Sequence, residues 1–156
     1  MYHITTMTLP YAEEISRWVY PGEYHIYSFE PSDEVIEELL CGDYAACLDE
    51  KETLIGYFCF GASARIPTVE NYDYPENKLD FGLGLRPDLC GKGLGQEFMN
   101  CGLEYAKQTF SVSSLRLTVA AFNQRAISLY RKFGFQQILE VTHRFSRMPF
   151  ILMEQQ

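Results

Sequence analysis

The segment covering residues 79–110 constrains the fold more than any other part of this sequence. Its first stretch, L-D-F-G-L-G-L, alternates and predicts a strand over 79–85, in which two glycines favour a bulge or a close backbone approach. A turn with Gly91, Gly93 and Gly95 follows, and a helical pattern covers 93–110. Glycines let backbone N–H groups approach a ligand, and the first N–H groups of a helix have no internal partner. This order of elements predicts an anion site suited to a diphosphate.

Two common phosphate-binding loops do not match this turn. A Walker loop requires Ser or Thr after Gly-Lys, and here Gly93 follows Lys92. A dinucleotide fingerprint counted from Gly91 requires glycine at its sixth position, which is Gln96. An enzyme that uses the turn as one of these nucleotide-phosphate loops is therefore the weakest functional alternative. The structural alternative is a glycine-rich turn that holds no ligand.

Patterns elsewhere in the chain interleave strands with helices. Strands are predicted over residues 2–7, 44–48, 53–60, 115–120, 137–142 and 150–154. Helices are predicted over 12–20, between a Ser32 cap and Gly42, and between an Asn123 cap and Gly134. The stretch 61–78 shows no period, which is typical of a functional or mobile loop. We expect an α/β fold with some antiparallel pairs and, since no repeat or linker is visible, one domain over residues 1–156.

Length and charge narrow the functional classes. A chain of 156 residues can bury a core without disulfides. Thirteen basic and 21 acidic residues give a net charge of −8, which argues against nucleic-acid binding through a basic patch and against a polybasic membrane contact. The same charge would attract a cationic substrate, although solubility alone also explains it.

The cysteines, the histidines and the N-terminus indicate a reduced compartment and no metal. Five cysteines form an odd set with no CxxC pair, which favours free thiols in a cytoplasmic protein. The three histidines have no metal-ligand spacing. No apolar run approaches the roughly 18 residues of a membrane helix, and the first ten residues lack a secretory pattern. We therefore expect a cytoplasmic protein without a metal site.

A second segment changes the interpretation of the glycine turn. It reads N-Q-R-A-I-S-L-Y-R-K-F-G-F over residues 123–135. Together the two segments resemble the GCN5-related N-acetyltransferase (GNAT) family, in which a Q/R-x-x-G-x-G/A loop precedes an N-x-x-A-x-x-x-Y-x-x-x-G-F helix. The loop reads C-G-K-G-L-G here, and Asn123, Ala126 and Tyr130 match the second motif at the family spacing. The first loop position departs from the family, because Cys90 replaces Gln or Arg.

The resemblance implies a fold and a co-substrate. The fold would be the GNAT-like acyl-CoA N-acyltransferase fold, a mixed central sheet flanked by helices on both faces. The co-substrate would be acetyl-coenzyme A (acetyl-CoA), with the backbone of Leu83, Gly84 and Leu85 pairing with its pantetheine arm. A bulge there would aim an N–H at the thioester carbonyl. The diphosphate would be held by the backbone N–H groups of Gly91, Lys92, Gly93, Leu94, Gly95 and Gln96. Because main-chain groups hold it, Cys90 should not prevent binding.

Two residues of the second motif each have two interpretations. Asn123 is explained as a helix N-cap, and by resemblance it also hydrogen-bonds the cofactor arm. Tyr130 lies on the apolar stripe of its helix, which predicts a core aromatic. By resemblance its phenol is also the catalytic acid that protonates the departing coenzyme A thiolate.

The general base is the open part of the sequence analysis. One branch of the family carries a glutamate where this chain has Thr118, which cannot serve. Another branch uses a glutamate near the position of Asp80, but a solvated aspartate at a strand edge is the competing interpretation. Water relays from Glu23, His25 or Glu30 have no spacing rule behind them.

Our leading hypothesis is an acetyl-CoA-dependent N-acetyltransferase that acts by direct attack in a ternary complex. The acceptor would be a primary amine of a small molecule, peptide or protein. Five N-terminal aromatic residues would form its pocket or simply pack as core: Trp18, Tyr20, Tyr24, Tyr27 and Phe29. The alternative hypothesis is a non-catalytic coenzyme A sensor or structural protein. No nucleic-acid or membrane partner is expected, and family members are often dimers, so a homodimer is compatible.

Overall fold

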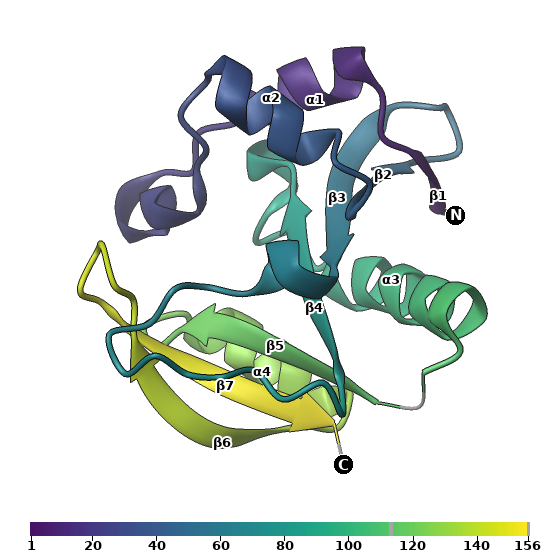
Figure 1. The fold of residues 1–156 in the computed structure, drawn as a ribbon. Helices are drawn as coiled ribbons and strands as arrows, with labels where there is room; N and C mark the ends of the chain where they lie inside the picture. Colours follow the sequence, from purple (N-terminus) through teal and green to yellow (C-terminus); the bar gives the residue numbers. More distant parts are fainter. Residues whose placement is uncertain (113, 156) are drawn as a thin grey trace. The chain divides into compact units, whose positions relative to one another are not determined.

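The computed structural model describes residues 1–112 and 114–155 and divides them into two compact units. The first unit contains residues 1–59 and 83–110, and the second contains residues 60–82 and 111–156. Figure 1 labels the elements of both units, and strand β4 (Leu79–Leu85) contributes residues to each. No helix within the described ranges is long and apolar enough to cross a membrane.

The first unit is built on an antiparallel sheet. Strand β1 (His3–Thr6) pairs with β2 (Tyr44–Leu48), and β2 pairs with β3 (Leu54–Phe60). Its helices are α1 (Leu9–Ser16), α2 (Asp33–Leu39) and α3 (Gly95–Phe110), with short 3₁₀ helices η1 (Gly22–Tyr27) and η3 (Pro87–Leu89). The Ser32 side chain caps α2 by accepting a hydrogen bond from the Val35 N–H at 3.1 Å, which confirms the predicted cap.

Helices cover both faces of β3 within this unit. Neighbouring strand residues point to opposite faces, so Tyr57 and Phe58 meet different elements. The Tyr57 ring lies 6.3 Å from that of Trp18, which follows α1, whereas the Phe58 ring stacks on Phe98 of α3 at 4.5 Å. Figure 1 shows α1 and α2 on one side of β2 and β3, with α3 on the other.

Two glycines bring α3 close to β3. A Cβ at Gly56 of β3 would lie 2.6 Å from the Phe98 ring of α3. In turn, a Cβ at Gly102 of α3 would lie 2.4 Å from the Phe58 ring of β3. Each element therefore accepts an aromatic ring from the other at a position where only glycine leaves room.

The second unit contains the parallel pair that makes the strand pattern mixed. Strand β4 pairs in parallel with β5 (Leu115–Ala120), in the register Leu79↔Leu115 and Asp80↔Arg116. Strand β7 (Pro149–Gln155) pairs antiparallel with both β5 and β6 (Phe135–Thr142). Helix α4 (Gln124–Lys132) precedes β6, and the 3₁₀ helix η2 (Gly61–Ala64) begins the long loop before β4.

Most predicted elements appear within two or three residues of their predicted bounds, and two differ for a local reason. Helix α1 ends at Ser16 rather than residue 20, because the backbone turns ahead of Pro21 and continues through Gly22 at φ +61° into η1. Helix α3 begins at Gly95 rather than residue 93, because Gly93 adopts the left-handed conformation at φ +79°.

Candidate functional site

The glycine turn of the first unit has the conformation that the sequence predicts. After η3, Gly91 and Gly93 adopt φ values of +74° and +79°, which only glycine reaches without strain. The Cys90 thiol lies 3.6 Å from the carbonyl oxygens of both Leu85 and Arg86 and donates toward them, so this side chain folds back onto its own turn. The Cys90 side chain is therefore engaged with main-chain carbonyls that precede the glycines.

The N-terminus of α3 follows this turn directly. The first helical hydrogen bond runs from the Phe98 N–H to the Leu94 carbonyl at 3.1 Å. The N–H groups immediately before Phe98 are thus those that an α-helix leaves without an internal acceptor, and they carry the positive end of its dipole. A Cβ at Gly93 would meet no atom within 4 Å, so there is open space beside the turn. This arrangement fits a diphosphate held by main-chain N–H groups.

The carboxyl end of β4 is fixed against β3 in the same unit. The Arg86 N–H donates to the Ile55 carbonyl at 2.8 Å, and the Arg86 guanidinium donates to the Leu54 carbonyl at 2.8 Å. Because backbone groups alternate along a strand, those of Leu83 and Leu85 face away from β3. Leu83 and Leu85 are therefore better placed than Gly84 to pair with an added extended chain.

Asn123 and Tyr130 lie in the second unit, around α4. The Asn123 side-chain oxygen accepts the Ala126 N–H at 3.2 Å, which confirms the N-cap interpretation. Tyr130 is buried and its ring meets Phe135 edge-on at 6.1 Å, which confirms the core-aromatic interpretation. The cofactor contact of Asn123 and the acid role of Tyr130 stay predictions.

The expectation that Asp80 is a solvated strand-edge aspartate is wrong. Only 3% of its side chain is exposed, and its carboxylate accepts hydrogen bonds from Arg116 Nε at 2.6 Å and Arg116 Nη2 at 2.8 Å. Arg65 Nε adds a third contact at 2.7 Å. Parallel pairing places Asp80 beside Arg116, which lies fully buried on β5. Both oxygens of this carboxylate are already engaged by guanidinium groups, so the structure disfavours Asp80 as the base.

The aromatic residues of the N-terminal region divide between two roles in the first unit. Trp18 and Phe29 pack against Tyr57, with ring centroids 6.3 and 6.0 Å apart. The Tyr20 hydroxyl instead donates to the Leu85 carbonyl of β4 at 2.7 Å. Burial raises the pKa of Tyr20 above its usual range, so this phenol stays protonated.

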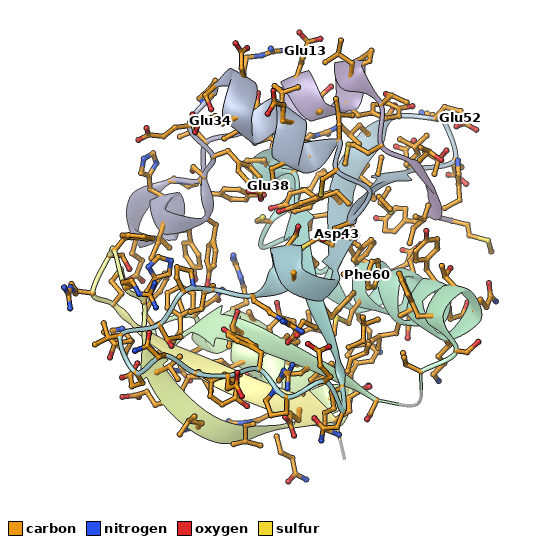
Figure 2. All side chains as sticks on the ribbon, viewed as in Figure 1. Glu13, Glu34, Glu38, Asp43, Glu52 and Phe60 are labelled. Atoms are coloured by element: carbon orange, nitrogen blue, oxygen red, sulfur yellow. The ribbon has the colours of Figure 1, made fainter. Side chains whose placement is uncertain are left out.

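Glu38 belongs to the same cluster and was not predicted. The buried Tyr44 hydroxyl donates to its carboxylate at 2.7 Å, and the Tyr44 ring lies 5.9 Å from that of Tyr57. Burial, followed by nearby Cys59 and the bond to Glu38, raises the pKa of Tyr44 above its usual range. Figure 2 labels Glu38 on α2 and Asp43 just before β2. No local pattern reveals this pairing, because it depends on where α2 packs.

Comparison with known proteins gives one family and one fold. The model of the acetyltransferase (GNAT) family matches residues 10–135. Spermidine N(1)-acetyltransferase from Escherichia coli K12 is 27% identical over 97 residues, which cover 62% of this chain and 52% of that protein. The chain thus spans about half the length of the curated relatives it matches.

Solved structures agree with the expected fold. Aminoglycoside acetyltransferase AAC(6')-Ib in complex with coenzyme A superimposes with a TM-score of 0.74 at 17% identity, over 99% of this chain and 94% of that one. A variant of spermidine N-acetyltransferase SpeG from Vibrio cholerae superimposes with a TM-score of 0.69 at 18% identity, over 98% of this chain and 92% of that one. At such identities these likenesses concern the fold, and they confirm the predicted α/β class. With the family match over most of its length, this chain belongs to the acetyltransferase (GNAT) family.

Proposed function

We propose that this protein is an acetyl-CoA-dependent N-acetyltransferase that acetylates a primary amine. The observation that carries the proposal is the turn with left-handed Gly91 and Gly93, placed between the end of β4 and the N-terminus of α3. Main-chain N–H groups at such a position suit a diphosphate. Membership of a family of acetyltransferases supports acetyl-CoA as its carrier and disfavours a non-catalytic sensor.

The proposed reaction needs no covalent enzyme intermediate. The neutral amine nitrogen attacks the thioester carbon and loses one proton to solvent, the C–S bond breaks, and the sulfur leaves as a thiolate that takes up a proton. Residues 91–96 would hold the diphosphate and Leu83–Leu85 the pantetheine arm, while Asn123 would contact that arm. Tyr130 would supply the proton and regain one from solvent; a phenol of pKa about 10 is a slightly weaker acid than a thiol of pKa about 8.5, and a hydrogen bond in the transition state bridges this mismatch.

For the acceptor we propose a small cationic amine. The net charge of −8 favours approach of a cation. The Glu38 carboxylate accepts from the Tyr44 hydroxyl, and the Tyr44 ring lies 5.9 Å from that of Tyr57; a carboxylate near aromatic rings suits an ammonium group. Similar proteins are named for spermidine and aminoglycoside acetylation, which is the same chemical class. We also propose that residues 1–156 act as one domain in the cytoplasm without a metal, and that a homodimer is the form to test first.

The first experiment measures cofactor binding. If acetyl-CoA binds the folded protein, a concentration 100 times its Kd stabilises it by about 2.7 kcal/mol, or a rise of roughly 5–10 °C in Tm. No rise in Tm at millimolar acetyl-CoA would contradict the proposal. A panel of mono-, di- and polyamines is then screened for release of free thiol, and the best substrates should carry more than one positive charge.

The second experiment tests the acid. Tyr130→Phe should lower kcat at least tenfold, because the thiolate must then take its proton from water. Tyr72→Phe is the control, since this tyrosine also lies in the second unit and makes an edge contact, with Tyr74 at 4.8 Å. Equal turnover in both variants would exclude Tyr130 as the acid.

A further inference from the structure

Tyr20 lies outside both sequence motifs, yet it contacts the backbone of β4 in the first unit. Its hydroxyl donates to the Leu85 carbonyl at 2.7 Å, and the side chain is 8% exposed. Its own N–H donates to Ser28 Oγ at 2.9 Å, just after η1. Tyr20 is therefore fixed at both its backbone and its hydroxyl.

The peptide group between Leu85 and Arg86 is held at both ends. Its N–H belongs to Arg86 and donates to the Ile55 carbonyl of β3 at 2.8 Å. Its carbonyl belongs to Leu85 and, across a trans peptide, points the opposite way, toward the Tyr20 hydroxyl. The side of β4 that faces away from β3 is where an added extended chain would pair. Tyr20 therefore contacts that side directly.

The Leu85 carbonyl can accept from Tyr20 and from a ligand together. A carbonyl oxygen has two lone pairs: one accepts the phenol, and the other is met by the weak donor of the Cys90 thiol at 3.6 Å, which a ligand N–H would replace. The phenol also stays a donor, because burial raises its pKa. Tyr20 thus fixes the direction of this carbonyl without blocking it.

Tyr57 constrains the preceding residue in a complementary way. A Cβ at Gly84 would lie 2.3 to 2.6 Å from three atoms of the Tyr57 side chain, including its hydroxyl oxygen. Tyr57 is itself packed by Trp18 and Phe29. The ring closes one face of β4 at Gly84, while Tyr20 fixes the edge at Leu85.

We propose that Tyr20 is a positioning residue for acetyl transfer. Its hydroxyl orients the Leu85 peptide group, along which the acetyl-pantetheine arm pairs. Tyr57 packs against the face of β4 at Gly84 and supports the same strand. The inference rests on the proposed function, because it needs an acyl-pantetheine arm on β4. Tyr20 acts through the backbone and touches no reacting atom. A donor aimed at a developing oxyanion contributes to the transition state, so a loosened strand lowers kcat. The diphosphate would bind at the N–H groups of residues 91–96, whereas Tyr20 acts at Leu85, so coenzyme A binding should change less than turnover.

The test compares two variants that each remove one buried phenol bound to a main-chain carbonyl. Tyr20→Phe removes the bond to Leu85. Tyr74→Phe is the matched control, because the Tyr74 hydroxyl donates to the Ile66 carbonyl at 3.0 Å and its side chain is 7% exposed. Tm, the Kd for coenzyme A by calorimetry, and kcat with the best amine are measured for both and for the unmodified protein.

The expected result is a split between binding and turnover. Tyr74→Phe should lose at least as much stability as Tyr20→Phe, because the Tyr74 hydroxyl also accepts the Ile66 N–H at 3.1 Å. Tyr20→Phe alone should lower kcat at least tenfold, with the Kd for coenzyme A within threefold of the unmodified protein. A kcat within twofold of the unmodified protein overturns the inference, and so does an equal loss in Tyr74→Phe. If the unmodified protein neither binds acetyl-CoA nor acetylates an amine, it is the proposed function that fails. Should Tyr20→Phe not fold, Ser28→Ala, which removes the 2.9 Å bond that fixes the Tyr20 backbone, must lower kcat with an unchanged Kd for coenzyme A, and normal turnover in that variant overturns the inference.

Discussion

Replacement of Asp80 by asparagine is the sharpest test of the second unit. The Arg116 side chain is fully buried, and Asp80 supplies two of its hydrogen bonds at 2.6 and 2.8 Å. Arg116 Nη1 has no hydrogen-bond partner among the described residues, and its nearest carboxylate oxygen, on Glu154, is 3.9 Å away. Asp80→Asn therefore leaves a buried positive charge with little compensation.

The expected loss is large. Removing one member of a buried ion pair typically costs about 3–5 kcal/mol in the free energy of unfolding. For a chain of this length, each kcal/mol lowers Tm by roughly 2–4 °C, so Tm should fall by roughly 6–20 °C. Urea unfolding followed by circular dichroism gives the free energy, and a thermal scan gives Tm.

The control uses the other carboxylate that contacts Arg65. Glu76 is 84% exposed and pairs with Arg65 Nη2 at 3.0 Å, so Glu76→Gln should change stability by about 1 kcal/mol or less. Combining Asp80→Leu with Arg116→Met removes both charges and should cost less than either change alone. A loss under about 1 kcal/mol in Asp80→Asn would refute the reasoning. Normal stability with abolished turnover would instead restore Asp80 as a candidate base.

Three further predictions concern the cap, the packing of α3 and the thiols. Asn123→Ala should lower the free energy of unfolding by about 1 kcal/mol, because it removes the cap. Asn123→Ser keeps the cap. Weaker coenzyme A binding by a stable serine variant would therefore support the predicted cofactor contact. Gly102→Ala should cost about 1–3 kcal/mol in urea unfolding, because its Cβ would lie 2.4 Å from the Phe58 ring; an unchanged midpoint would contradict this packing. At pH 8, iodoacetamide should modify exposed Cys41 well before buried Cys59, because burial raises the pKa of Cys59 to about 12; mass spectrometry of the peptides gives the order, and equal rates would contradict it.

Local patterns were sufficient for the elements and for the glycine turn. The strand over 79–85 and the cap at Asn123 follow from neighbouring residues, and both appear in the structure as predicted. The left-handed glycines follow the same logic, because a tight turn before a helix requires them.

Contacts between distant segments could not be predicted in this way. Asp80 looks like the polar position of an alternating strand, and only its parallel pairing with β5 shows that it meets a buried arginine. The bond from Tyr20 to Leu85 and the bond from Tyr44 to Glu38 depend on how α1, η1 and α2 pack. Which side chains are buried between elements depends on tertiary packing, and local patterns in a single sequence do not predict it.

The reciprocal exchange of rings between β3 and α3 has a consequence for ligand capture. Because Phe98 fills the space over Gly56 while Phe58 fills the space over Gly102, a one-turn slide of the helix along the strand would put both rings against occupied positions. The position of α3 along β3 is therefore fixed before any anion binds. If a diphosphate binds at this turn as proposed, it meets N–H groups already in place, and less of its intrinsic affinity is lost to ordering the protein.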